Sequence, residues 1–319
     1  MSKPKFAIYW AGSCGGCEIA FLDIREKILA VDEAVDLVFC PCIMDTKYKD
    51  IENMSDDEID VCLFNGVIRN EENLHLAELL RKKSKVLVAY GSCASEGCIP
   101  GLANLTNKDE ICQYVYDQSP SVGSDKKIMP VTKHKTKAGQ LTLPAMFDYV
   151  RTLDQVVDVD YKMPGCPPVA EQIWAVIEAV LSGQLPEKGA LIGVNPKTVC
   201  DECKRTKEEK RIKKFVRPHL IKEVDPDKCL LEQGIICNGP ATHAGCGALC
   251  PQVNLGCRGC YGPAEGISDI GGKLAGAIAS IIESDDPEEI ETITNQIIDP
   301  VGTFYRFNLP SSLLGRRVK

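Results

Sequence analysis

Cysteine is the residue whose number and spacing could support chemistry in this chain. There are 17 cysteines but only 4 histidines. Several cysteines stand in close pairs, such as Cys14-x-x-Cys17 and Cys200-x-x-Cys203. The first ten residues, MSKPKFAIYW, contain no apolar signal core, so we expect a cytoplasmic chain, and structural disulfides are rare in that compartment. The close pairs are therefore predicted to be metal ligands.

Four cysteines in the first half of the chain follow β-rich segments. Their contexts are GSCGGCE for Cys14 and Cys17, GSCASEGC for Cys93, and PGCPP for Cys166. Because open α/β sheets bind ligands at the carboxyl ends of their strands, these loops are expected to converge on one inorganic core. A phosphate-binding turn is a rival interpretation, but GSCGGC lacks G-x-G-x-x-G. Small buried cysteines in ordinary turns are the structural alternative.

Eight further cysteines lie between residues 200 and 260, in a glycine-rich segment. Eight thiols fit two four-thiolate sites. Zinc accepts the same C-x-x-C spacings and stays open as an alternative. The glycine density and the scarcity of histidine favour iron–sulfur clusters, although the spacing differs from that of bacterial ferredoxins. The eight candidates are Cys200, Cys203, Cys229, Cys237, Cys246, Cys250, Cys257 and Cys260.

The remaining cysteines are weaker candidates. Cys62 lies inside an apolar strand pattern, and both it and Cys112 are expected to be ordinary packed residues. Cys40 and Cys42 also follow a predicted strand, so their position alone would admit them as ligands. The sequence leaves their role open.

The first half alternates apolar strand patterns with helix-length segments. Such alternation predicts βαβ crossovers and a parallel sheet covered on both faces, here a flavodoxin-like doubly wound α/β domain. A segment over 107–145 lacks periodicity and is expected to be an insertion between sheet elements. The predicted strands are 5–10, 35–40, 59–66, 85–90 and 156–163, and the predicted helices are 18–30, 70–83 and 168–182.

The composition changes after residue 183, so we expect two domains, 1–183 and 184–319. The second is rich in cysteine, glycine and proline, and such a segment needs bound cofactors to hold an irregular fold. Helices are expected over 271–284 and after 285. The longest apolar run, 274–282, is far too short to span a membrane.

Charge argues against nucleic acid as a partner. The chain of 319 residues is 44% hydrophobic and 26% charged, with a net charge of -8, and its isoelectric point is about 5.2. This balance describes a globular, acidic chain. One basic run, 203–219, departs from it with eight basic and two acidic residues. It is either a solvated face or a docking patch for an electron-transfer partner.

The motifs around Cys14, Cys93 and Cys166, with CNGP and CRGCYGP further along, resemble the small subunit of nickel–iron hydrogenases over nearly the whole chain. The resemblance is strongest to the cytoplasmic methanogen type that does not reduce a deazaflavin. It implies a proximal cluster next to the nickel–iron centre of a separate large subunit, then a medial and a distal cluster. The implied proximal ligands are Cys14, Cys17, Cys93 and Cys166, the medial ones Cys246, Cys257 and Cys260, and the distal ones Cys200, Cys203, Cys229 and Cys237.

Two departures from that pattern matter. Cys200 stands where many relatives have a histidine, which implies an all-thiolate distal site. Many relatives hold a three-iron medial cluster, but Cys250 could supply a fourth ligand here; without it the medial cluster would be 3Fe-4S. Cys98 lies where oxygen-tolerant relatives place an extra proximal cysteine. The second extra cysteine of those relatives would stand at Gly16, so their modified proximal cluster is not expected here.

The resemblance implies an electron-transfer subunit without catalytic residues of its own. Electrons from dihydrogen oxidised in the large subunit would pass through three 4Fe-4S clusters to an iron–sulfur acceptor subunit linked to heterodisulfide reductase. No nucleic-acid binding and no direct membrane insertion are expected. The alternatives are a quinone-reductase-type relay subunit, which would not need the eight later thiols, and a zinc-stabilised structural or nucleic-acid-binding protein.

Overall fold

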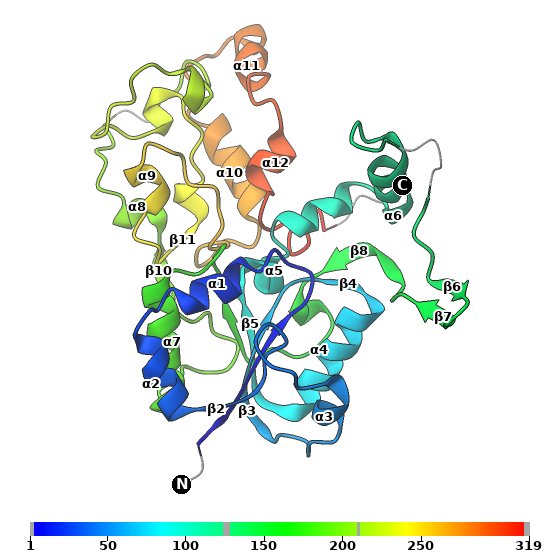
Figure 1. The fold of residues 1–319 in the computed structure, drawn as a ribbon. Coiled ribbons are helices and arrows are strands. Elements are labelled where there is room, and N and C mark those ends of the chain that lie inside the picture. The colour runs from blue at the N-terminus through cyan, green and yellow to red at the C-terminus, as the bar shows by residue number, and fades with distance from the viewer. Residues whose placement is uncertain (1–2, 124–127, 209–210, 316–319) are drawn as a thin grey trace.

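A computed structural model describes residues 3–123, 128–208 and 211–315. Its centre is a parallel sheet with strand order β2-β1-β3-β5-β9 (Figure 1). Counted along the chain, the five sheet strands have the order 2-1-3-4-5 of flavodoxin-like folds, which confirms the predicted fold class. The strands are β1 (Lys5–Trp10), β2 (Asp36–Phe39), β3 (Ile59–Asn65), β5 (Ser84–Tyr90) and β9 (Tyr161–Met163).

Helices cover both faces of this sheet because alternate residues of each strand point to opposite sides. Val61 and Leu63 of β3 belong to one buried core, while Cys62 and Phe64 belong to the other. The interpretation of Cys62 as a packed core residue is confirmed, since it is wholly buried. One face carries α1 (Gly16–Leu22), α2 (Lys27–Ala34) and α7 (Ala170–Leu181), and the other carries α3 (Tyr48–Glu52) and α4 (Glu71–Lys83) (Figure 1).

Two sequence predictions were wrong in detail. The helix expected over 18–30 is two helices, because α1 ends at Leu22 and Arg25 takes a left-handed backbone with φ 60° before α2 begins at Lys27. The strand expected over 156–163 pairs only from Tyr161 to Met163. Its earlier valines pack against the core from a loop, so their apolar pattern reflects burial rather than strand pairing.

The insertion expected over 107–145 does leave the sheet between β5 and β9. Among its described residues are α6 (Lys108–Gln113), the π-helical turn Tyr114–Gln118 and a hairpin of β6 (Lys133–Thr136) and β7 (Gly139–Thr142). The hairpin projects away from the body of the molecule (Figure 1). The chain returns through β8 (Met146–Arg151), which pairs antiparallel with β4 (Ile68–Asn70).

The cysteine-rich second half is built from short elements around small cores. The predicted helix over 271–284 is the shorter α10 (Ile270–Ala279), which begins where the Asp269 carboxylate accepts the Gly272 N–H at 2.7 Å. Among the described residues, every helix is too short or too polar to span a bilayer. The other elements are β10 (Asn195–Thr198), α8 (Val199–Glu202), β11 (His243–Ala244), α9 (Leu249–Gln252), α11 (Pro287–Thr294) and α12 (Pro300–Phe304).

The end of the described chain returns to the first half. Pro310 packs where side chains of Gly97 and Gly101 would stand, with its ring carbons 2.3 and 2.4 Å from the respective ideal Cβ positions. The Ser311 hydroxyl donates to the buried Glu96 carboxylate at 2.6 Å. These contacts hold the C-terminal segment against α5 (Gly91–Glu96), the helix that carries Cys93.

Candidate metal centres

The first candidate centre, the proximal set, consists of Cys14, Cys17, Cys93 and Cys166. These residues follow β1, β5 and β9, so the parallel strands deliver them to the same edge of the sheet. Burial raises the pKa of the Cys17 thiol, and the nearby charges of Glu18, Cys93, Cys166 and Cys14 raise it further. Cys14, Cys93 and Cys166 also line one cavity of about 530 Å³. The structure therefore brings the four residues together.

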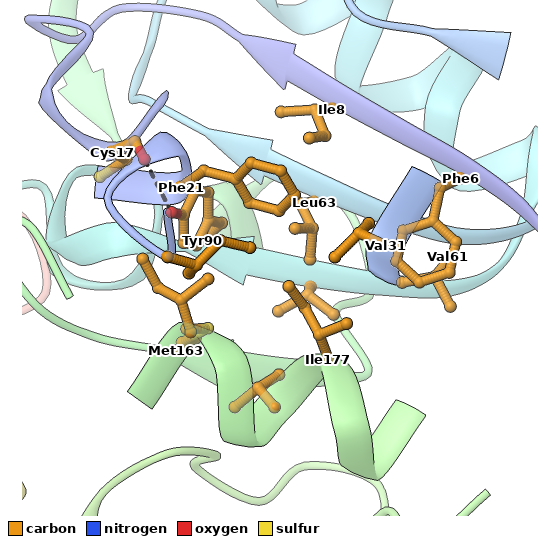
Figure 2. Close-up of a cluster of buried hydrophobic side chains, with 14 of the residues drawn as sticks. Phe6, Ile8, Cys17, Phe21, Val31, Val61, Leu63, Tyr90, Met163 and Ile177 are labelled. Atoms are coloured by element: carbon orange, nitrogen blue, oxygen red, sulfur yellow. Dashed lines mark hydrogen bonds between the residues drawn. The ribbon is translucent and has the colours of Figure 1, made fainter. Parts of the chain in front are cut away.

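Tight backbone packing places Cys17 in this set. Gly91 has φ 80°, and an added Cβ would lie 2.3 Å from the Cys17 Sγ, so only glycine fits there. The Tyr90 hydroxyl donates to the Cys17 carbonyl at 2.7 Å, as Figure 2 shows. Phe21 and Met163 pack around this bond in the core below the turn (Figure 2). Strand β5 thus fixes the helix that carries Cys17.

Ser92 is a site residue that the sequence analysis missed. Its N–H donates to the Gly165 carbonyl at 2.8 Å, and its hydroxyl accepts the Gly165 N–H at 2.9 Å. The same hydroxyl donates to the carbonyl of Cys260. Ser92 therefore ties the loop of Cys166 to a loop of the second half. Its only sequence signal was its place beside Cys93.

The distal set consists of Cys200, Cys203, Cys229 and Cys237. All four line one small cavity beside α8. Burial, followed by the charge of Cys237, raises the pKa of the Cys200 thiol to about 12. Gly239 lies close to Cys200 and Cys237. A Cβ added at Gly239 would stand 3.3 Å from the Cys200 Sγ and 3.5 Å from the Cys237 Sγ. The four residues come from three separate segments that converge here.

The medial set consists of Cys246, Cys250, Cys257 and Cys260. Burial raises the pKa of the Cys260 thiol to about 12, and the charges of Cys166, Cys246 and Cys250 add to the effect. Cys250 therefore stands within electrostatic range of the other medial thiols. The Cys257 N–H donates to the Cys237 Sγ at 3.2 Å.

These contacts place the medial set between the other two. Ser92 ties the carbonyl of Cys260 to the loop of the proximal Cys166, and the Cys257 N–H donates to the Sγ of the distal Cys237. The three sets therefore form one continuous series through the protein. The order in space, proximal to medial to distal, differs from the order in sequence, in which the distal pair Cys200 and Cys203 precedes the medial thiols.

Cys98 is a fifth cysteine beside the proximal set. It is buried, and its thiol contacts the Cys166 Sγ at 3.5 Å. Hydrogen bonding to Cys166, then to Cys93, raises the pKa of the Cys98 thiol. By contrast, neither Cys40 nor Cys42 lines the proximal cavity; Cys40 is buried after β2 and Cys42 is exposed. Cys112 is half-buried on α6 and does not line the proximal cavity, although its neighbour Ile111 does.

The three sets fit iron–sulfur clusters. The proximal and distal thiols line cavities. The donors are soft sulfur atoms, and one of them already accepts a backbone N–H, as cluster thiolates do.

Comparison with known families separates the two halves of the chain. A sequence model of the family described as NADH ubiquinone oxidoreductase, 20 Kd subunit, matches residues 14–180. That match covers the proximal set and ends before Cys200. The quinone-reductase alternative therefore leaves the eight later cysteines unexplained.

Full-length relatives explain both halves. The chain is 40% identical to the iron–sulfur subunit of the F420-non-reducing hydrogenase of Archaeoglobus profundus, with 98% of each chain covered. It is 38% identical to the equivalent F420-non-reducing hydrogenase subunit of Methanothermobacter marburgensis, over 99% of this chain and 98% of the relative. A solved NAD+-reducing [NiFe]-hydrogenase chain matches with a TM-score of 0.50 and 28% identity, over 58% of this chain and 94% of that chain. The chain belongs to this family of F420-non-reducing hydrogenase subunits and is an iron–sulfur, electron-transferring subunit of a hydrogenase.

Proposed function

We propose that the chain holds three 4Fe-4S clusters, one in each of the proximal, medial and distal sets, and divides near residue 183 into a proximal-cluster domain and a two-cluster domain. The observation that carries this proposal is the medial position of Cys246, Cys250, Cys257 and Cys260, which contact both other sets through Cys260 and Cys257. When bound, the clusters would supply one-electron transfer. The protein's own part is to fix their spacing, exclude water and adjust their potentials.

The proximal end fits a docking face for the hydrogenase large subunit. Cys14 is exposed and lines the proximal cavity, whose other lining residues are mostly apolar apart from Ser13 and Arg69. Ile19 on α1 is 62% exposed and Ile99 beside Cys98 is 53% exposed. Exposed apolar side chains close to the proximal cysteines are candidates for a contact surface. We place the nickel–iron centre of the partner large subunit against it.

The distal end fits an acceptor protein. Cys200, Cys229 and Cys237 line a second, mainly apolar cavity of about 400 Å³ whose charged lining residues are the cations Lys207 and Arg211 and one carboxylate, Glu232. Both cations belong to the basic run 203–219, of which residues 209 and 210 lie outside the described residues. A basic rim favours an acidic partner by speeding encounter. We propose an iron–sulfur acceptor subunit there, linked to heterodisulfide reductase, in the cytoplasm.

Replacement of Cys203 by alanine in the assembled hydrogenase tests the assignment. The variant should lose the distal 4Fe-4S EPR signal and at least about one iron per chain, because a distal ligand is gone. Electron delivery to an external acceptor should slow, while hydrogen isotope exchange in the large subunit continues. Cys112→Ala is the matched control, since this half-buried thiol lies in none of the three sets.

Two outcomes would overturn the proposal. One is loss of isotope exchange with an intact distal spectrum, which would place Cys203 at a different site. The other is a Cys203→Ala protein with unchanged iron and unchanged electron delivery.

A further inference from the structure

We propose that Glu202 and Arg205, on one short segment of the distal set, bias the medial and distal sites in opposite directions. The Glu202 carboxylate would lower the reduction potential at the medial set, and the Arg205 guanidinium would raise it at the distal set. The inference rests on the proposed cluster ligands and deepens that function by naming what favours outward electron flow. Both residues lie close to Cys203 in the sequence, so one short segment places a charge at the medial set and another at the distal set.

Arg205 is a buried cation with every donor in use. It is 7% exposed, and its Nε and one Nη2 hydrogen donate to the Pro251 carbonyl at 3.1 and 2.8 Å. Nη1 donates to the carbonyls of Asp225 at 2.6 Å and Lys228 at 2.9 Å. The other Nη2 hydrogen goes to the Asn254 side-chain oxygen. The guanidinium thus joins the chain after Cys250 to the chain before Cys229.

All of these acceptors are neutral. Among the described residues, no carboxylate oxygen lies within 4.0 Å of the Arg205 nitrogens. A buried charge without a counter-charge is costly, and arginine is seldom buried unless paired. Arg205 also lines the small cavity shared by the four distal cysteines. A four-thiolate cluster is an anion, so it supplies the missing counter-charge.

Glu202 carries the opposite charge to Arg205 and is hydrogen-bonded to the loop of the medial Cys246. Its two carboxylate oxygens accept the N–H groups of Gly245 at 2.8 Å and Gly247 at 2.9 Å. These amides flank Cys246, and the charge of Glu202 reaches that thiol, since it adds to the burial that raises the pKa of Cys246. Glu202 therefore positions a medial ligand and places a negative charge beside it.

Charge near an iron–sulfur cluster changes its reduction potential. An anion disfavours the added electron and lowers the potential, whereas a cation favours it and raises the potential. With Glu202 facing the medial set and Arg205 facing the distal set, an electron that moves outward goes to a site of higher potential, so its free energy falls and the transfer is favoured. Both residues are positioning residues, because they act through the cysteines and the surrounding charge.

Arg205 is tested by two variants in the assembled hydrogenase, Arg205→Gln and Arg205→Lys. Redox titration followed by EPR should show the distal potential shifted downward in Arg205→Gln, by more than the medial potential. Arg205→Lys keeps the charge but has fewer donors, so its distal potential should stay closer to that of the parent. Equal shifts in both variants, or a larger shift at the medial set, would overturn the assignment of Arg205.

Glu202 is tested with Glu202→Gln, which keeps the shape and one acceptor oxygen but removes the charge. The medial potential should shift upward, and Glu202→Asp should restore it in part. Lys213→Gln is the control, because Lys213 is 79% exposed and its charge is screened. An unchanged medial potential in Glu202→Gln would contradict the proposal, and this arm stands even where Arg205→Gln fails to assemble.

Failure of the ligand assignment is distinguishable from failure of this inference. If the eight later cysteines do not hold two clusters, the unmodified protein itself shows fewer than about 12 irons and lacks separate medial and distal signals. If the clusters are present but the medial and distal potentials are unchanged in Glu202→Gln and Arg205→Gln, only the electrostatic inference is wrong.

Discussion

The Ser92 hydroxyl donates to the carbonyl of Cys260, a residue 168 positions further along the chain. The bond joins the loop next to Cys93 with the loop of a medial thiol. It shows that the two halves of the chain are fastened at the point where the proximal and medial sets meet. Electron transfer depends steeply on distance, so a contact at this point also fixes the spacing on which the relay depends.

Replacement of Ser92 by alanine should loosen this junction. The Gly165 N–H and the Cys260 carbonyl would both lose their hydroxyl partner, and each buried group left unsatisfied costs about 1–3 kcal/mol of the free energy of unfolding. The measurement is denaturant unfolding of the anaerobic complex. Ser95→Ala is the control, because Ser95 is buried in the same helix but donates only to Ala89, at 3.1 Å. Equal losses in the two variants would mean that Ser92 has no special role at the junction.

Replacement of Gly91 by alanine should remove the proximal cluster. A left-handed backbone costs alanine about 1–2 kcal/mol, and the new Cβ would also collide with the Cys17 Sγ at 2.3 Å. Gly183→Ala separates the two effects, since Gly183 has φ 68° and nothing within 4 Å of its ideal Cβ. Iron analysis should show about four irons lost per chain in Gly91→Ala and none in Gly183→Ala. Full iron content in Gly91→Ala would contradict the packing argument.

Cys250→Ala should convert the medial site to a three-iron cluster. Cys250 lies within range of Cys260 and Cys246, so we expect it to hold the fourth iron. Iron content should fall by about one per chain, with the EPR signal of an oxidised 3Fe-4S cluster. Cys112→Ala should change neither quantity. If Cys250→Ala keeps its iron and spectrum, the medial cluster has another fourth ligand or only three irons.

Stability should fall as the pH rises, through Glu96. Burial raises the pKa of this carboxyl, although Lys162 and the Ser311 hydroxyl oppose the effect and Asp154 adds to it. The folded state therefore prefers the neutral acid, and this stabilising effect is lost as pH rises from about 4.5 through the raised pKa. Glu96→Gln should flatten that dependence and raise the Tm at neutral pH. The Tm of parent and variant is measured between about pH 5.5 and 8. If Tm changes with pH equally in both proteins, Glu96 is not the cause of the change.

The sequence was sufficient for the sheet and for the grouping of the thiols. Apolar runs such as 5–10 and 85–90 became β1 and β5 with the same bounds or within one residue, because a strand buried on both faces leaves a continuous pattern. The C-x-x-C pairs and the strand ends located the proximal set. In contrast, no glycine or proline marks the break between α1 and α2 at Arg25, so the sequence did not indicate it.

The residues that connect the three sets could not be predicted. Ser92, Glu202 and Arg205 are common residue types in short segments, and their roles depend on partners far along the chain, such as Cys260, Gly245 and Pro251. No local pattern encodes a contact of that kind. The cysteine spacing does not give the order of the medial and distal sets in space either; only the resemblance to hydrogenase small subunits indicated it.

Metal analysis of the anaerobically purified hydrogenase subunit most directly tests whether its twelve candidate thiols hold three clusters. Three 4Fe-4S clusters correspond to about 12 irons and about 12 acid-labile sulfides per chain, so we expect these values, with zinc near zero. Near-zero iron together with two or more zincs per chain would contradict it.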